Sequence, residues 1–210
     1  MTEKTVIRDV TPEERATAGA VITEALMTDP GWNAVVPEES KRRAALRTLM
    51  DVTFGYRASE VRVAVVDGEV AGVAVWVPPG RYPMPFTATL RATPRMLGLA
   101  LRIGGRLRDV ARFGSSIDAV FPAEPVRYLQ ALGVAPGHQG SGIGTELLRD
   151  GLAKADAAHE AVYLETSLER NVRLYGRQGF AVVPGSPGPL SDGGPVMWRM
   201  LRSANGAERA

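Results

Sequence analysis

The stretch that decides the fold is YLQALGVAPGHQGSGIG, residues 128–144. Its apolar part, 128–134, favours a β-strand, and the strand ends in a turn at 135–137. Glycines follow at 140, 142 and 144, before the helical pattern TELLRDGLAKADAAHE. A strand that enters a glycine-rich turn and then a helix is typical of phosphate binding, because a helix N-terminus presents unpaired N–H groups and a partial positive charge.

Three phosphate-binding patterns are candidates for this turn. The P-loop pattern GxxxxGK[ST] is excluded, because no Lys-Ser or Lys-Thr follows the glycines. The dinucleotide pattern GxGxxG fails at its last position, where Thr145 replaces glycine, although an acid follows at Glu165. The segment QGSGIG, 139–144, resembles the Q/R-x-x-G-x-G/A signature of the GNAT superfamily of acetyl-CoA-dependent N-acetyltransferases. A turn that only starts a helix is the structural alternative.

A second segment, YLETSLERNVRLYGRQGF at 163–180, resembles the other half of the same family's cofactor site. It contains a strand and a short helix that carries Asn171 and Tyr175. The stretch 129–183 and the ending GGPVMWRM, 193–200, resemble puromycin N-acetyltransferase-like enzymes of actinobacteria. Over the first part of the chain the resemblance extends only to the order of the elements.

The resemblance implies an α/β (α+β) GNAT-like fold with a mixed, mostly antiparallel sheet of about seven strands, splayed central strands and flanking helices. We expect one acetyltransferase domain over residues 1–210. Its parts would be an acceptor-side half at 1–125 with a helical insertion at about 88–115, an acetyl-CoA-binding core at 126–183, and a flexible tail at 203–210.

Composition narrows the possible functions. An apolar content of 45% and a charged content of 23% are typical of a soluble globular protein. A net charge of +2 gives no support to nucleic-acid binding. The absence of Cys excludes a thiol nucleophile and an acyl-Cys intermediate, and the two histidines show no metal-ligand spacing, so we expect no metal. With no signal peptide and no apolar run of about 20 residues, we expect no membrane association and a cytoplasmic location.

The other elements follow from periodicity and turn residues. We expect strands at 5–11, 61–66, 70–77, 128–134, 161–165, 180–183 and 196–201. Helices are expected from Thr11-Pro12 to about residue 28, at 38–56, at 145–158 and at 171–177, with a Gly/Pro loop at 184–195. Pro94 is expected to start or kink a further helix that runs to about residue 113. Gly133 predicts a bulge or a close backbone approach.

The insertion is rich in arginine, with Arg91, Arg95, Arg102, Arg106, Arg108 and Arg112 against the single acid Asp109. One interpretation is a basic face for an anionic partner or for cofactor phosphates. The other is a solvated helix face behind Leu97, Leu101 and Leu107. Its place in the order of elements also suggests a substrate lid.

The resemblance assigns cofactor contacts to the main chains of Leu132 and Val134 and to Gln139, Gly140, Ser141, Gly142, Ile143, Gly144, Thr145 and Asn171. It assigns the general acid to Tyr175, and the Val134 N–H is expected to donate to the oxyanion. The structural alternatives are a core aromatic for Tyr175 and a helix N-cap for Asn171. Ser141 stands where relatives often carry a cation, and Arg173, Leu174 and Gly176 also depart from the usual pattern around the acid.

Glu165 is the candidate general base, because it ends a strand beside the splayed pair; a carboxylate that only binds loop N–H groups is the alternative. His138 is expected to be a loop residue. At an ordinary pKa near 10, proton transfer from Tyr175 to a thiolate of pKa near 8.5 is uphill by about 2 kcal/mol.

These features predict direct acetyl transfer from acetyl-CoA to a primary amine of a small molecule, with antibiotics and aminonucleosides among the candidates. Acetylation of protein or peptide amines, a non-catalytic CoA-binding regulatory domain, and a nucleotide-binding oxidoreductase are the alternatives. The identity of the amine, the acyl-chain preference and the choice between monomer and homodimer stay open.

Overall fold

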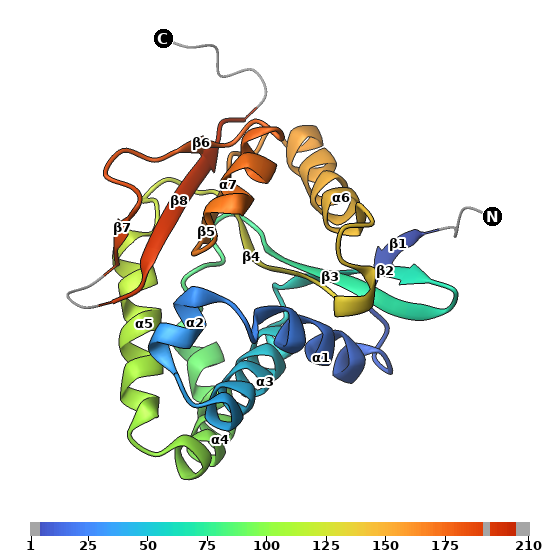
Figure 1. Ribbon diagram of the computed structural model, residues 1–210. Helices are drawn as coiled ribbons and strands as arrows, with labels where there is room; N and C mark the ends of the chain where they lie inside the picture. The colour runs from blue at the N-terminus through green and yellow to red at the C-terminus, as the bar shows by residue number, and fades with distance from the viewer. Residues whose placement is uncertain (1–4, 191–193, 205–210) are drawn as a thin grey trace.

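The computed structural model describes residues 5–190 and 194–204, and Figure 1 shows how its elements are arranged. Three expectations extend beyond this range: most of the tail at 203–210, part of the loop at 184–195, and the first residue of the motif GGPVMWRM. Those parts lie outside the described residues.

Eight strands form the sheet over the described residues. They are β1 (Val6–Asp9), β2 (Glu60–Val66), β3 (Glu69–Val77), β4 (Arg127–Val134), β5 (Val162–Thr166), β6 (Ala181–Val182), β7 (Gly188–Pro189) and β8 (Val196–Arg202). Their order is β1-β2-β3-β4-β5-β8-β6, with β7 also paired to β8. The prediction of about seven strands missed β7, because a two-residue strand in a Gly/Pro segment has no alternation to detect.

The described strand pairings are antiparallel except for β4 with β5. This confirms the predicted mixed, mostly antiparallel sheet with flanking helices. It is inconsistent with the nucleotide-binding oxidoreductase alternative, which needs a doubly wound sheet of consecutive parallel strands. The β2–β3 hairpin is also confirmed, and its turn residues Asp67 and Gly68 take φ values of 49° and 85°, as a two-residue hairpin loop requires.

Three helices, α1 (Arg15–Leu26), α2 (Pro30–Val35) and α3 (Glu39–Gly55), separate β1 from β2. The helix expected from Thr11 begins only at Arg15, because Glu14 accepts from the Thr11 N–H at 3.1 Å and from Arg8 at 2.6 Å. These contacts hold residues 11–14 in turns. The short helix α2 was not predicted. Pro30 starts it, and Asp29 caps it by accepting from the Trp32 N–H at 3.0 Å.

The insertion contains two helices, α4 (Phe86–Ile103) and α5 (Arg106–Val120), that meet at Gly104, where φ is 56°. Of the two roles predicted for Pro94, the helix start is wrong, since Pro94 lies inside α4, and the single helix to about residue 113 is in fact two. The expected burial of Leu97 and Leu101 was also wrong, because they are 63% and 90% exposed. Helix α4 carries two apolar rows, and the row that packs on α3 is the other one, Ala92, Leu99 and Ile103.

The C-terminal half contains η1 (Pro136–His138), α6 (Ile143–Ala157) and α7 (Glu169–Gly176). As predicted, α6 buries Leu147, Leu148, Leu152 and Ala155. The alternative that Asn171 is a helix N-cap is wrong, because α7 starts at Glu169 and its N-cap is Leu168.

Helices cover both faces of the sheet (Figure 1). One core lies under α6 and α7 and includes Trp76, whose ring packs against Gly151. The other lies under α1 and α3. At Gly133 a Cβ would lie 2.9 Å from the Ala25 Cβ, so the predicted close approach occurs here, against α1, and the irregularity in β4 falls instead beside Trp76.

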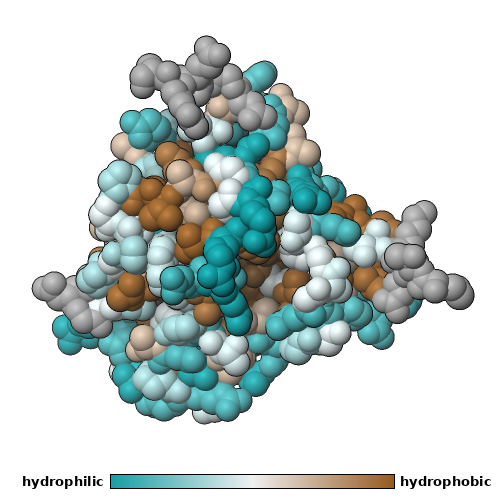
Figure 2. All heavy atoms as spheres, turned by 45° about the horizontal axis from the view of Figure 1, so that its top comes forward, coloured by the Kyte–Doolittle hydropathy of each residue, from teal (hydrophilic) through white to brown (hydrophobic). Residues whose placement is uncertain are grey.

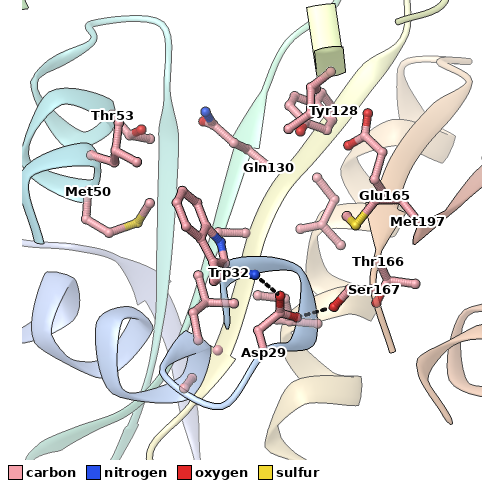
Figure 3. Close-up of a pocket in the computed structure, with 18 of the residues that line it drawn as sticks. Asp29, Trp32, Met50, Thr53, Tyr128, Gln130, Glu165, Thr166, Ser167 and Met197 are labelled. Carbon is pink, nitrogen blue, oxygen red and sulfur yellow. Dashed lines mark hydrogen bonds between the residues drawn. The ribbon is translucent and has the colours of Figure 1, made fainter. Parts of the chain in front are cut away.

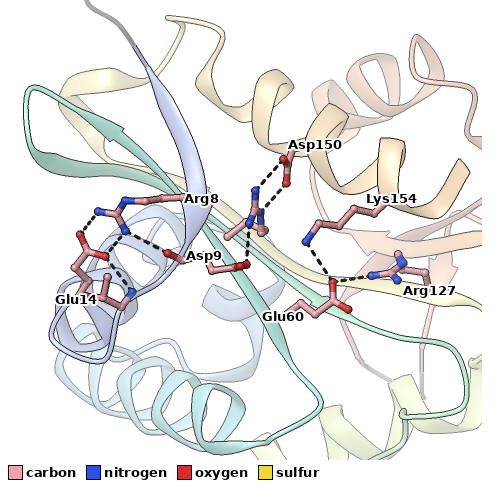
Figure 4. Close-up of polar contacts among 9 residues, drawn as sticks. Arg8, Asp9, Glu14, Glu60, Arg127, Asp150 and Lys154 are labelled. Carbon is pink, nitrogen blue, oxygen red and sulfur yellow. Dashed lines mark hydrogen bonds and ion pairs between the residues drawn. The ribbon is translucent and has the colours of Figure 1, made fainter. Parts of the chain in front are cut away.

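Two arginines connect the layers through ion pairs (Figure 4). Arg62 binds Asp9 and Asp150, each at 2.8 Å, and so joins the sheet edge to α6. Arg127 is buried and binds Glu60 on β2 at 3.0 Å and Glu160 at 2.6 Å. These ion pairs therefore hold the start of β4 in place, beside β5, with which β4 pairs over only two residues.

Candidate active site

The site begins where β4 and β5 separate. The two strands pair only at Arg127–Val162 and Tyr128–Tyr163, and no further pairing is described. A cavity of about 550 Å³ borders the open part. It extends from Gln139 and Gly144, at the glycine-rich turn, to Trp32 and Phe113 in the acceptor-side half. The predicted splay is therefore present and opens directly into a cavity.

The main chain of β4 has an unpaired edge towards this cavity. The Ala135 N–H donates to the Ala71 carbonyl oxygen on β3 at 2.8 Å. Because successive N–H groups of a strand point to opposite sides, those of Leu132 and Val134 point away from β3. Both residues line the cavity. The Val134 carbonyl accepts from Gln139 Nε2 at 3.2 Å, and the N–H of Val134 is the last outward-directed donor of the strand.

The glycine-rich turn has the geometry that a phosphate loop needs. Gly140 and Gly142 have φ values of 82° and 93°, which side-chain-bearing residues rarely adopt. Gly142 is the N-cap of α6, so the first N–H groups of that helix have no partner within it. The Ser141 hydroxyl, where relatives often carry a cation, donates to the His138 carbonyl oxygen at 2.6 Å.

The predicted residues divide between the cavity and the turn. Those that line the cavity are Leu132, Val134, Gln139, Gly144, Glu165, Asn171 and Tyr175. Those of the turn that do not line it are Gly140, Ser141, Gly142, Ile143 and Thr145. Ile143 is buried and packs on Gly72. The turn can therefore bind a phosphate through its backbone N–H groups and the N-terminus of α6.

Glu165 lies on β5 and points towards Tyr128 of β4 (Figure 3). Burial raises the pKa of Glu165 to about 7, although polar contacts with Tyr128 and Tyr163 and the charge of Arg199 act in the opposite direction. Its Oε1 and the Tyr163 hydroxyl are buried without a regular hydrogen bond. Glu165 is thus a carboxyl group that can gain and lose a proton near neutral pH.

Tyr175, on α7, is 6% exposed and contacts Phe180 with ring centroids 5.8 Å apart. It also lines the cavity, so it is not sealed inside the core. Burial raises the pKa of Tyr175 to about 12. Proton transfer from this phenol to a thiolate of pKa near 8.5 is then uphill by about 5 kcal/mol, more than the sequence suggested.

Asn171 and the end of β5 form a small polar group beside Tyr175. The Asn171 Nδ2 donates to Thr166 Oγ1 at 3.3 Å, and the same oxygen accepts from the Leu168 N–H at 3.2 Å. Asn171 and Thr166 both line the cavity. Thr166 therefore orients Asn171, a role that the sequence did not indicate.

Sequence reasoning also missed the acceptor-side wall. Asp29 accepts from Ser167 Oγ at 2.5 Å and thereby ties the start of α2 to the end of β5. Across the cavity the Tyr82 hydroxyl donates to Asp118 Oδ1 at 2.6 Å. No motif marks these residues, because they come from segments far apart in the chain. The only available signal was Asp29 before Pro30, an N-cap followed by proline.

The arginine-rich insertion contributes a wall of this cavity through α5. Helix α5 lines the cavity with Val110, Phe113, Ile117 and Asp118. None of the six arginines of the insertion is among the lining residues, and Arg106 instead binds Glu38 at 3.0 Å. Figure 2, in which α6 and α7 come forward, shows a mainly hydrophilic face with separate apolar patches.

A model of the acetyltransferase (GNAT) family matches residues 32–180, more than half of the chain. The protein belongs to the GNAT acetyltransferase family. Enzymes of this family use acetyl-CoA as the cosubstrate, together with an acceptor. The outward N–H groups of β4, the positive-φ glycines and the free N-terminus of α6 fit that cosubstrate, since they supply donors for an extended amide chain and for a pyrophosphate.

Solved structures agree with this assignment. A Corynebacterium glutamicum protein described as histone acetyltransferase HPA2 and related acetyltransferase is 26% identical, with a TM-score of 0.72 and coverage of 98% of this chain and 99% of that one. An agmatine N-acetyltransferase is 17% identical, with a TM-score of 0.59 and coverage of 94% and 98%. A GNAT protein from Elizabethkingia anophelis with acetyl-CoA bound is 16% identical, with a TM-score of 0.50 and coverage of 95% and 97%.

Two features are absent from the described ranges 5–190 and 194–204. None of their helices combines the length and the apolar character that crossing a membrane requires. No three or more His, Asp or Glu side chains within them gather as a set of metal ligands.

Proposed function

We propose that this GNAT protein transfers the acetyl group of acetyl-CoA directly to a primary amine of a small molecule, in the cytoplasm where acetyl-CoA is available. The observation that carries the proposal is that one cavity is bordered by the free edge of β4, the carboxyl group of Glu165 and the phenol of Tyr175. These are a binding edge, a base and an acid, the groups that direct acyl transfer to an amine needs.

Glu165 would accept a proton from the acceptor. An alkylammonium of pKa near 10.4 loses its proton to a carboxylate of ordinary pKa at a cost of about 8 kcal/mol, but to one of pKa near 7 at about 5 kcal/mol. Burial of Glu165 thus removes roughly 3 kcal/mol from the step. Its side chain faces the point where β4 and β5 separate (Figure 3). The thioester would lie at this point.

The Val134 N–H would stabilise the developing oxyanion, because it is the donor on the open edge of β4 closest to the glycine-rich turn. Tyr175 would then supply a proton to the leaving thiolate. Since its pKa is about 12, we expect Tyr175 to transfer the proton as the carbon–sulfur bond breaks and not before. Leu132, Val134, Asn171 and the turn residues 139–145 would hold the cosubstrate.

The proposal is tested by release of CoA thiol with acetyl-CoA and a panel of aminonucleosides, aminoglycosides, polyamines, arylalkylamines, amino acids and peptides. We expect turnover with small primary amines, and aminonucleosides belong in the panel because residues 129–183 resemble puromycin N-acetyltransferase-like enzymes. Acetyl-CoA binding by calorimetry without thiol release from any amine would favour a non-catalytic CoA-binding domain. Turnover confined to peptides would favour acetylation of protein amines.

A further inference from the structure

The wall that α2, α3 and α5 form at the acceptor end of the cavity is mainly apolar, with Thr53 and Asp118 as its polar side chains. Helices α2, α3 and α5 contribute Trp32, Leu49, Met50, Val52, Val110, Phe113 and Ile117 to its lining, and Met84 joins them from the segment before α4. Figure 3 shows Trp32 and Met50 across the cavity from Glu165. A small cationic acceptor would leave this surface in contact with water, whereas an apolar group would cover it.

This wall is held in place by contacts of its own. The rings of Trp32 and Phe113 meet edge to face, with centroids 5.4 Å apart and an interplanar angle of 77°. The backbone of Trp32 is fixed through Asp29, which accepts from the Trp32 N–H and from Ser167 Oγ. The wall is therefore a prearranged aromatic surface, and a ligand group that packs on it need not order it first.

The carboxylates that line the cavity are not equally free to bind a cation. Both oxygens of Asp29 accept hydrogen bonds from the protein. Asp118 accepts from Tyr82 and lies at an exposed position of α5. Of the three, only Glu165 has a buried carboxylate oxygen that makes no regular hydrogen bond, although the hydroxyl groups of Tyr128 and Tyr163 are near its carboxyl group. One deep carboxyl group faces an apolar wall, so a second ammonium group on the acceptor would have to be desolvated against Trp32 and Ile117.

We propose that the acceptor is a monoamine that carries an aromatic or bulky apolar group, which packs against Trp32, Phe113 and Ile117 while its amino group reaches Glu165. This deepens the proposed function and rests on it. The inferred substrate class differs from the diamines and guanidino-amines that bear a charge at both ends. In the reaction, Glu165 takes the ammonium proton and releases it to solvent, and the neutral amine nitrogen then forms a bond to the acetyl carbon. The carbon–sulfur bond breaks, the second proton leaves the nitrogen to Glu165, the thiolate receives a proton from Tyr175, and the phenolate regains its proton from solvent.

A matched set of acceptors tests the proposal on the full-length protein. We expect kcat/KM for 2-phenylethylamine to exceed that for n-butylamine and 1,4-diaminobutane by about 10–100-fold, the gain expected from burying an aromatic ring. Equal or faster acetylation of 1,4-diaminobutane or agmatine would overturn the inference and leave the proposed function intact. Failure to acetylate any amine would overturn both.

A variant pair links the preference to this wall. Ile117→Asp should lower kcat/KM for 2-phenylethylamine at least 10-fold and shift the preference towards 1,4-diaminobutane, with unchanged acetyl-CoA affinity. Leu101→Asp, at a 90% exposed position of the same insertion, should leave both rates unchanged. If Ile117→Asp does not fold, Trp32→Leu provides the same comparison. An unchanged preference in a folded wall variant would overturn the inference.

Discussion

The cofactor side and the acceptor side of the cavity are built in different ways. The first is built mainly from backbone: the open edge of β4 lines it, and the glycine-rich turn, with its two positive-φ glycines and the start of α6, lies at its end. The second is a surface of side chains from α2, α3 and α5. A backbone site leaves its mark on the local sequence, because only glycine permits its geometry. A side-chain wall leaves none, because each helix contributes only one to three ordinary apolar residues.

The sharpest test of this difference separates chemistry from binding at Tyr175. Tyr175→Phe removes only a hydroxyl group, so we expect kcat to fall by about 10²–10⁴-fold while the Kd for acetyl-CoA stays the same. Stopped-flow thiol release and calorimetry give the two values. An unchanged kcat would exclude Tyr175 as the acid, and a large rise in Kd would show that the cofactor side depends on side chains as well.

Glu165→Gln tests the deep end of the acceptor side. We expect a loss of about 10²-fold or more in kcat/KM at pH 7. With an arylamine acceptor, which stays neutral across the range, the wild-type kcat/KM should rise with pH through about 7, the pKa of Glu165, because only the ionised carboxylate is a base. The variant should lack this rise, and a rise that persists would assign it to another group.

The same substitution, which lowers activity, should remove a loss of stability at higher pH. The folded carboxyl keeps its proton up to pH about 7, whereas an unperturbed carboxyl loses it near 4.5. Between these values the native state binds more protons than the unfolded state, so the free energy of unfolding falls as pH rises. In Glu165→Gln this fall should be absent, and melting curves at pH 5 and pH 8 would show it.

Arg127→Met tests the junction between the two sides. Arg127 is buried and its partners Glu60 and Glu160 are partly buried, so we expect a loss of about 3 kcal/mol in the free energy of unfolding and a Tm lower by about 6–12 °C. Arg43→Met is the control, because Arg43 pairs with Glu24 and Glu39 at the surface and should change stability by less than about 1 kcal/mol. Equal effects would contradict a structural role for Arg127.

The smallest expected effect concerns the turn itself. Gly142→Ala places a Cβ at a φ of 93°, a strain of about 1–2 kcal/mol that should weaken acetyl-CoA binding by about 5–30-fold. Gly137→Ala, at a position with open space around it, should bind normally. If both variants bind equally well, the backbone of this turn does not determine affinity.

The outcome of the sequence predictions follows the same division. The β2–β3 hairpin and α6 were predicted closely, because turn residues such as Gly68 and the periodic leucines of α6 act over short distances. The burial of Leu97 and Leu101 was predicted wrongly, because α4 has two apolar rows and only contact with α3 selects one. The pairing of Asp29 with Ser167 could not be predicted, since residues far apart in the chain meet only in the folded protein.

The brief contact between β4 and β5 has a consequence for folding. Strands β4 and β5 pair at only two residue pairs, with the ion pairs of Arg127 near the joined end. Few backbone hydrogen bonds therefore connect the part of the sheet up to β4 with the part that begins at β5. A pantetheine chain along the open edge of β4 would supply donors and acceptors that no strand provides. We therefore expect CoA to act as a folding ligand, raising Tm with concentration and protecting amides on both sides of the gap from hydrogen exchange.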